Sequence, residues 1–265
     1  MKAGALRPIR GRGFGRTRTF AGTGVAAAVL VPVELALRRV SSATRPRMPW
    51  LFHRALARSL GINVVVHGRQ AHGGGVLFVA NHLSWADIPV LGSRILAAFV
   101  AKSEVAGWGP VGWLSTLART VYIDRAHRQA TGDARSAIVE RLAAGENVIL
   151  FPEGTNSDGI AVLPFKSALF AAIEGSADFT IQPVTLAYTR LNGLPITRER
   201  LPEIAWIGDT ALLPHLLAFM SLGQVRAEIC FHAPVKVADF PDRKALARHC
   251  HAVVADGYRR LMRGI

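Results

Sequence analysis

Apolar and polar positions divide this chain into two parts that differ in pattern. Residues 1–60 contain a long apolar run, Phe20 to Leu37, and a shorter amphipathic stretch, Trp50 to Leu60. From Gly61 onward, short runs rich in β-branched residues alternate with longer stretches of helical periodicity. The pattern predicts an N-terminal helical segment, residues 1–60, followed by a single domain, residues 61–265.

The second part is predicted to alternate strands with helices. The expected strands are Ile62 to His67, Val76 to Ala80, Ala98 to Ala101, Val121 to Ile123, Val148 to Phe151, Thr180 to Tyr188 and Val225 to Phe231. The expected helices are Trp85 to Leu96, Arg128 to Ala144, Phe165 to Glu174, Ala211 to Leu222 and Arg243 to Met262. This alternation is typical of βαβ crossovers, so we expect an α/β fold with a largely parallel central sheet flanked by helices.

Length and cysteine content narrow the class of protein. The chain has 265 residues, 50% of them hydrophobic, so it can bury a sizeable core as one domain. Its two cysteines, Cys230 and Cys250, lack the spacing of zinc ligands and are expected to be reduced thiols. His249 and His251, two positions apart in a predicted helix, face different sides of it. We therefore expect no metal site.

The net charge of +14 is concentrated in the first part of the chain. Residues 1–60 hold 12 of the 32 basic residues and one acid, Glu34, whereas the rest of the chain holds 20 basic and 17 acidic residues. A nucleic-acid enzyme is expected to carry its basic stripe on the folded domain. Here arginines flank the apolar run on both sides, which favours an anionic membrane surface as partner and no nucleic acid.

The apolar run is short for a membrane span. Glu34 interrupts it after 14 residues, Phe20 to Val33, and a span needs about 20. Basic residues on both sides give no asymmetry that would orient a crossing, and they fit a secretory signal poorly. We predict an anchor that lies in the membrane interface; the alternative is a disordered basic tail followed by a core helix.

Three strand ends carry residues suited to chemistry, and the first follows the strand Val76 to Ala80. His82 and Asp87 are five positions apart, so they meet only if His82 lies in a turn and Asp87 near the start of a helix. Pro89 supports this, because proline is tolerated in a first turn. A histidine oriented by a carboxylate is the arrangement of a general base. The alternative is that Asp87, alone or with Ser84, only caps the helix.

The other two strand ends have weaker local signals. Arg125 follows a short strand and could hold an anionic headgroup through two parallel hydrogen bonds, or form only a surface ion pair. Glu153, Gly154 and Thr155 follow the strand Val148 to Phe151. Glycine permits close backbone approach and a hydroxyl adds a donor, but an ordinary turn fits these residues equally well.

Together, the strand ends resemble the blocks of the lysophospholipid acyltransferase family, the 1-acylglycerol-3-phosphate acyltransferases. Its blocks read Asn-His-x4-Asp, a strand ending in arginine, Phe-Pro-Glu-Gly-Thr-x-Ser, and a strand with proline. The matching residues are Asn81, His82 and Asp87; Tyr122 to Arg125; Phe151 to Ser157; and, loosely, Ile181 to Val184. A single block is a weak signal, but the ordered set is specific and favours the functional interpretation of each.

The resemblance implies an O-acyltransferase of membrane lipid synthesis on the cytoplasmic face of the inner membrane. His82 would take the proton from a lysolipid hydroxyl while Asp87 holds the ring tautomer. The hydroxyl would attack the thioester of acyl carrier protein or coenzyme A directly, without any further cofactor. The residues implied to position the acceptor are Arg125, Glu153, Gly154, Thr155 and, at another strand end, Lys102.

Two departures from the family pattern concern the acceptor. Arg119 and Thr120 occupy a region where the family usually has glycine, and Asn156 replaces the arginine of Thr-Arg-Ser. One cation is lost and another gained, which disfavours a bare phosphate headgroup. The surrounding stretches resemble the branch that acylates lyso-ornithine lipid, whose headgroup has a carboxylate and an amine. Asp158 and Asp209 could face the amine or be turn residues, and lysophosphatidate stays the alternative acceptor.

Two other classes of protein account for parts of the sequence. A lipase-like hydrolase fits His72 and the three glycines after it as an oxyanion-hole motif. The chain has no Gly-x-Ser-x-Gly nucleophile elbow, however, so we expect these glycines to form a flexible turn. A non-enzymatic, basic nucleic-acid-binding protein fits the net charge. If the chain is an acyltransferase, deletion of residues 1–60 removes most of any nucleic-acid affinity.

Overall fold

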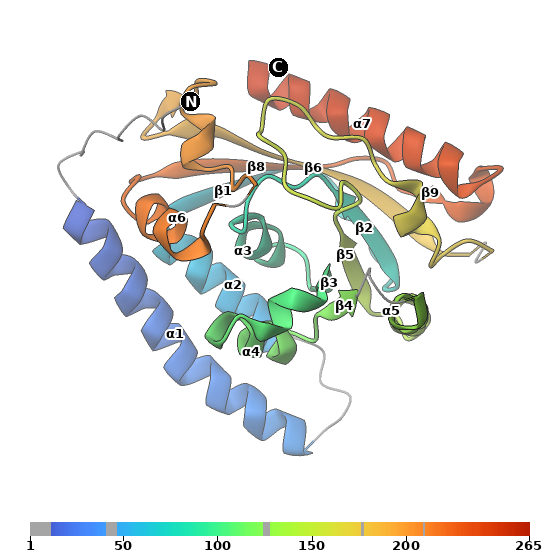
Figure 1. Ribbon diagram of the computed structural model, residues 1–265, viewed down its shortest axis with the longest axis horizontal. Coiled ribbons are helices and arrows are strands. Elements are labelled where there is room, and N and C mark those ends of the chain that lie inside the picture. The colour runs from blue at the N-terminus through green and yellow to red at the C-terminus, as the bar shows by residue number, and fades with distance from the viewer. Residues whose placement is uncertain (1–11, 41–46, 124–127, 176–177, 209) are drawn as a thin grey trace.

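The computed structural model describes residues 12–40, 47–123, 128–175, 178–208 and 210–265. Its centre is a sheet with the strand order β1-β8-β6-β2-β5-β3-β4 (Figure 1). These strands are β1 (Ile62–Gly68), β2 (Val76–Ala80), β3 (Ala97–Lys102), β4 (Val121–Ile123), β5 (Asn147–Leu150), β6 (Thr180–Leu191) and β8 (Val225–Phe231). Two short strands, β7 (Leu194–Pro195) and β9 (Val235–Lys236), pair with β6.

The sheet is largely parallel. From β6 through β2, β5 and β3 to β4, each strand is parallel to its neighbour, and β1 is parallel to β8. The exception on this path is the antiparallel pair β6–β8. β2 lies between β5 and β6 and is buried along its whole length, as expected for a strand of a covered parallel sheet. The predicted α/β fold with flanking helices is confirmed.

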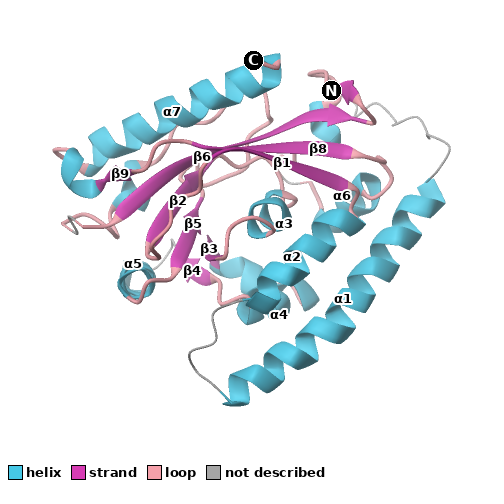
Figure 2. Ribbon diagram, turned by 180° about the vertical axis from the view of Figure 1, so that it is seen from behind, coloured by secondary structure: helices cyan, strands magenta, loops and turns pink. Residues whose placement is uncertain are grey.

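Helices cover both faces of the sheet. α7 (Arg243–Arg263) lies on one face, and α2 (Arg47–Ser59) and α3 (Asp87–Gly92) lie on the other (Figures 1 and 2). The remaining helices of the domain are α4 (Pro110–Leu117), α5 (Arg128–Ala143) and α6 (Leu212–Phe219). α7 begins where the Asp242 side chain accepts the N–H of Ala245 at 2.7 Å and ends at Gly264, which has a positive φ.

The apolar run near the N-terminus belongs to one long helix, α1 (Arg12–Val40), which lies alongside α2 (Figure 2). The hydroxyl of Thr19 donates to the carbonyl of Ser59 at 2.7 Å and joins the two helices. Pro32 does not end the helix, and Glu34 is only 7% exposed. The stretch Gly15–Ala36 is therefore long and apolar enough to cross a membrane, longer than the 14 residues expected from the sequence.

The helices of the structure differ from the predicted ones in three places. The segment Phe165 to Glu174 is not an α-helix: it contains one 3-10 turn, Ser167–Phe170, and the N–H of Lys166 donates to the carbonyl of Pro152 at 2.9 Å. α4 was not predicted, since its residues are almost all apolar and show no helical alternation of polar positions. The helix expected over Trp85 to Leu96 is confined to α3.

Candidate active site

The turn after β2 brings His82 and Asp87 together at the carboxyl end of a central strand. His82 lies in this turn, and Asp87 is the first residue of α3. Nδ1 of His82 and Oδ2 of Asp87 are 2.7 Å apart. The two residues thus have the geometry expected from their spacing, because the chain turns before the helix begins. The carboxylate also accepts N–H groups of the turn that precedes α3, whereas the start of α3 has no side-chain cap.

The Asp87 carboxylate is buried and satisfied on both oxygens. Oδ2 accepts the backbone N–H groups of Leu83 at 2.6 Å and Ser84 at 2.9 Å. Oδ1 accepts the hydroxyl of Tyr188, on β6, at 2.7 Å. Burial, followed by the charge of Asp87, raises the pKa of Tyr188 well above its usual range, so this hydroxyl keeps its proton. The carboxylate therefore favours a proton on Nδ1 of His82 and leaves Nε2 as the basic atom.

Glu153 fixes the backbone of the same turn. Its Oε1 accepts the N–H of His82 at 2.8 Å, and its Oε2 accepts the N–H of Leu163 at 3.1 Å. Burial raises the pKa of Glu153 from 4.5 to about 8; the two N–H donors oppose this shift, and the charge of Asp87 adds to it. The side chain is 1% exposed. The described contacts of Glu153 are thus with the backbone of the turn, and the headgroup contact expected from the sequence stays a prediction.

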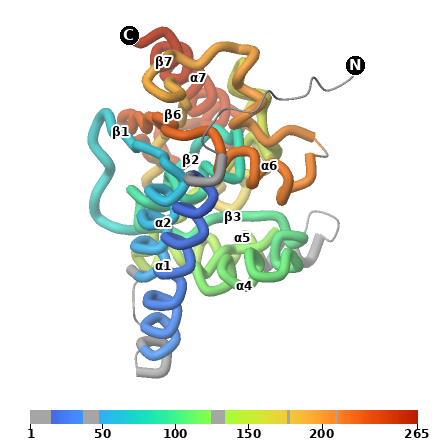
Figure 3. The backbone as a smooth tube through the Cα atoms, turned by 90° about the vertical axis from the view of Figure 1, so that its left-hand side faces the viewer, coloured from blue at the N-terminus to red at the C-terminus, as the bar shows by residue number. Residues whose placement is uncertain are grey.

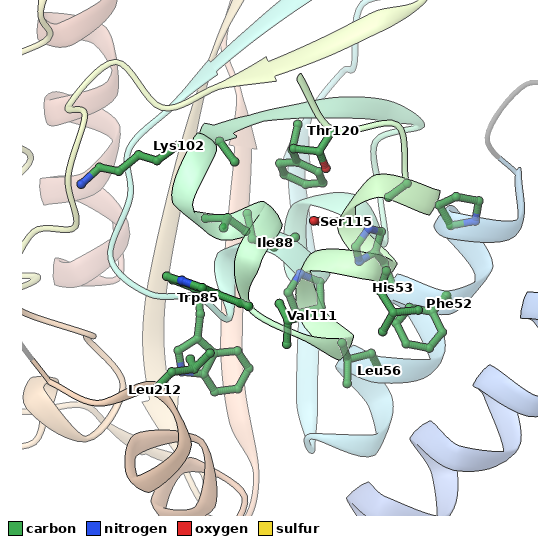
Figure 4. Close-up of a pocket in the computed structure, with 18 of the residues that line it drawn as sticks. Phe52, His53, Leu56, Trp85, Ile88, Lys102, Val111, Ser115, Thr120 and Leu212 are labelled. Atoms are coloured by element: carbon green, nitrogen blue, oxygen red, sulfur yellow. The ribbon is translucent and has the colours of Figure 1, made fainter. Parts of the chain in front are cut away.

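His82 opens onto a large apolar cavity. Its ring stacks on Phe151, with centroids 4.0 Å apart and planes 14° from parallel, and its side chain is 18% exposed. The cavity has a volume of about 630 Å³, in the range of pockets that hold drug-sized ligands. Phe52, Leu56 and Val111 form part of its wall (Figure 4). A base at the wall of such a cavity can act on a polar group joined to a long apolar chain.

Comparisons with known proteins agree with this geometry. Residues 63–187 match the family model described as Acyltransferase. The lyso-ornithine lipid O-acyltransferase of Brucella abortus is 41% identical over 225 residues, which cover 83% of this chain and 84% of that protein. The chain belongs to this acyltransferase family. The acyltransferase is also 35% identical to the 1-acyl-sn-glycerol-3-phosphate acyltransferase of Neisseria meningitidis, over 77% of this chain and 79% of that protein.

A solved structure shows the same fold. The 1-acyl-sn-glycerophosphate acyltransferase PlsC from Thermotoga maritima superposes with a TM-score of 0.66 and 22% sequence identity. The match covers 94% of this chain and 97% of that one. This likeness confirms the architecture of the acyltransferase, while the family assignment rests on the sequence relatives.

The other predicted site residues of the acyltransferase fall into two groups. Gly154 and Thr155 line the cavity, and Lys102, which is exposed at the end of β3, lies at its edge with its amine extending away from the apolar wall (Figure 4). Arg125 and Asp209 lie outside the described residues. The structure therefore brings His82, Gly154 and Thr155 to one cavity. The role of Arg125 stays a prediction from the sequence.

The two departures from the family pattern have structural partners. Arg119 pairs with Glu146 at 2.9 Å and is not among the described residues that line the cavity. Asn156 does line it, and its Nδ2 donates to the carbonyl of Trp206 at 2.9 Å. Asp158 accepts the N–H of Ile160 at 2.9 Å, as a turn residue does. The cation gained at position 119 is thus engaged away from the cavity.

Sequence reasoning missed two contributors to the site. Tyr188 lies within an apolar strand and contacts Asp87 only because β6 is adjacent to β2. Trp85 forms cavity wall, and its indole N–H donates to Nδ1 of His215, on α6, at 3.0 Å. His215 is buried, which lowers its pKa and keeps it neutral as the acceptor. The only sequence signal for either contact was a polar group in an otherwise apolar element.

Proposed function

We propose that the acyltransferase moves a fatty acyl chain from the thioester of acyl carrier protein or coenzyme A to the hydroxyl of lyso-ornithine lipid. The observation that carries this is the His82–Asp87 pair on the wall of an apolar cavity, in a chain of this family. Four relatives named lyso-ornithine lipid O-acyltransferase are 34–42% identical to it. Relatives named for 1-acyl-sn-glycerol-3-phosphate are 35% identical or less among those compared.

His82 acts as the general base in this proposal. Nε2 takes the proton from the acceptor hydroxyl as its oxygen attacks the thioester carbon. The carbon–sulfur bond then breaks, and the thiolate that leaves takes up the proton from the imidazolium, so that the enzyme returns to its starting state. Asp87 stabilises the imidazolium without accepting its proton. Gly154 and Thr155, which line the same cavity as His82, position the acceptor, and Arg125 holds the anionic part of its headgroup.

The reaction takes place at the cytoplasmic face of the inner membrane in this proposal. The stretch Gly15–Ala36 supplies the apolar anchor, and arginines before and after it suit the anionic leaflet. The acyl chain of the lysolipid occupies the apolar cavity, while the water-soluble carrier thioester approaches from the aqueous side. Domain organisation follows from this: residues 1–60 associate with the membrane and residues 61–265 carry the chemistry.

A competition between acceptors tests the proposal. Purified enzyme receives acyl carrier protein thioester, with lyso-ornithine lipid and lysophosphatidate together in mixed micelles. Faster acylation of lyso-ornithine lipid is the expected result, and Arg125→Ala should lower it because a buried headgroup charge without its partner costs about 3–5 kcal/mol. Exclusive acylation of lysophosphatidate would show that the acceptor is wrong, and transfer to neither would contradict the proposed activity as a whole.

A further inference from the structure

Two short helices beside the cavity have apolar side chains on both of their faces. Leu114 of α4 and Leu216 of α6 line the cavity. On the outward side, Trp113 of α4 is 50% exposed and Leu213 of α6 is 64% exposed. Neither of these two belongs to the described lining of the cavity. A helix that separates a cavity from water is expected to present mostly polar residues outward. The exposed residues of α6 are apolar, and those of α4 are apolar except for Thr116.

The absence of charge extends beyond the two helices. Residues 105–118 and 210–225 contain no Asp, Glu, Lys or Arg, although such residues make up 19% of the chain. The histidine of the second stretch, His215, is buried against Trp85 and contributes no exposed charge. Charged groups are costly in hydrocarbon, whereas tryptophan is enriched where hydrocarbon meets headgroups. Both stretches therefore have the composition of a surface in contact with lipid.

This surface is continuous with α1. Nε of Arg16 donates to the carbonyl of Leu217 at 3.3 Å, which joins α1 to α6. The Trp206 ring packs edge-on against Trp108 at 5.8 Å, which joins the segment before α6 to the turn before α4. Figure 3 shows α4 and α6 on the same side of α1. We define the apolar rim as the exposed side chains of these segments: Trp108, Val111, Trp113, Ile207 and Leu213.

We propose that the apolar rim inserts into the lipid bilayer as a second membrane contact, separate from α1. The cavity then opens into the leaflet between α1 and the rim, since α1, α4 and α6 all contribute to its lining. A lysolipid could enter tail first without its chain crossing water. The inference rests on the membrane association proposed above, and it adds where the bilayer meets the catalytic domain.

Fluorescent probes on single cysteines test the rim in the full chain. Cys230→Ala and Cys250→Ala remove the native thiols, and Trp113→Cys, Leu213→Cys, Val29→Cys and Leu194→Cys each add one labelling site. Val29 is 57% exposed on α1, and Leu194, 68% exposed on β7, is the matched control away from the rim (Figure 3). The labelled proteins bind vesicles of phosphatidylcholine and phosphatidylglycerol that contain bromine-labelled acyl chains, which quench a probe only on contact.

The four positions separate the possible outcomes. Strong quenching at 29, 113 and 213, with little at 194, is the expected result. Quenching at 29 without quenching at 113 and 213 overturns the rim and leaves the membrane anchor standing. No quenching at any position overturns both. If the thiol-free protein misfolds, Trp113→Ser and Leu213→Ser in the native chain should slow acylation of vesicle-embedded acceptor severalfold relative to Leu194→Ser; an equal rate for all three overturns the rim.

Discussion

The hydroxyl of Tyr188 donates a 2.7 Å hydrogen bond to Oδ1 of Asp87, while the other oxygen of that carboxylate faces Nδ1 of His82 at the same distance. Tyr188 and Asp87 are both 0% exposed, so no solvent can replace either partner. β6, which carries Tyr188, lies directly beside β2, and the pairing of these strands brings the hydroxyl to the carboxylate. The orientation of the His82–Asp87 pair thus depends on the core of the sheet.

Tyr188→Phe should slow turnover severalfold with little change in the KM for the acceptor. The substitution leaves a buried carboxylate oxygen without a donor, which costs about 1–3 kcal/mol and loosens the hold on His82. Tyr258→Phe is the matched control, because its hydroxyl donates to the carbonyl of Gly159. Steady-state kinetics and thermal unfolding of both variants measure the effect. If both lose stability and both keep their kcat, Tyr188 has only a structural role.

His82→Ala should abolish acyl transfer and leave the fold intact, because His82 is the imidazole of the cavity lining that a buried carboxylate, Asp87, orients. Asp87→Asn should lower kcat by a factor on the order of 10⁴, since the imidazole loses both its tautomer and its counter-charge. His72→Ala, on the exposed turn before β2, is the control and should keep full activity. Acylation assays and circular dichroism are sufficient measurements. Near-normal turnover by a well-folded His82→Ala variant would show that His82 is not the general base.

Stability should fall as pH rises from about 4.5 to 8, and Glu153 should account for much of the fall. Burial raises its folded-state pKa from 4.5 to about 8, so the folded state binds this proton more tightly than the unfolded state. Between these values the unfolded chain releases the proton first, which favours unfolding, and above about 8 the effect levels off. Thermal unfolding of wild type and Glu153→Gln from pH 5 to 9 measures it. Parallel pH profiles for the two proteins would contradict the assignment.

The sequence predicted the elements whose own residue pattern is periodic. It did not predict contacts between residues that are far apart in the chain. β2, β6 and β8 were placed within a few residues, because buried β-branched runs leave no helical alternative. The His82–Asp87 pair followed from spacing, since both partners lie in one turn. Tyr188 and His215 could not be found this way, because their partners are set by strand order and by the docking of α6. The sequence also could not show that Glu153 accepts the backbone N–H groups of His82 and Leu163, because Leu163 is brought to it by the loop after β5.

No covalent acyl-enzyme should form during transfer. Ser84, the serine nearest to His82 in the chain, is 0% exposed, and Asp87 holds the backbone of its turn. Burial raises the pKa of Cys250 to about 12 and also raises that of Cys230, so neither thiol is an activated nucleophile. Enzyme incubated with radiolabelled acyl donor and no acceptor should retain no label after denaturation. Label on a serine or cysteine would show that transfer proceeds in two steps.

Asn156→Ala should raise the KM for the lysolipid acceptor severalfold and change kcat little. The backbone N–H of Trp206 donates to the carbonyl of Leu83 at 2.9 Å, and its backbone carbonyl accepts from Nδ2 of Asn156. Two hydrogen bonds therefore hold this segment at the cavity beside the turn that carries His82. Loss of the Asn156 hydrogen bond removes about 0.5–1.5 kcal/mol of stabilisation and lets the segment open. Asn147→Ala is the control, because its amide also donates to a carbonyl, that of Leu96, but outside the described lining. The control should lose stability and keep its KM. An unchanged KM in Asn156→Ala would mean that the segment plays no part in holding the acceptor.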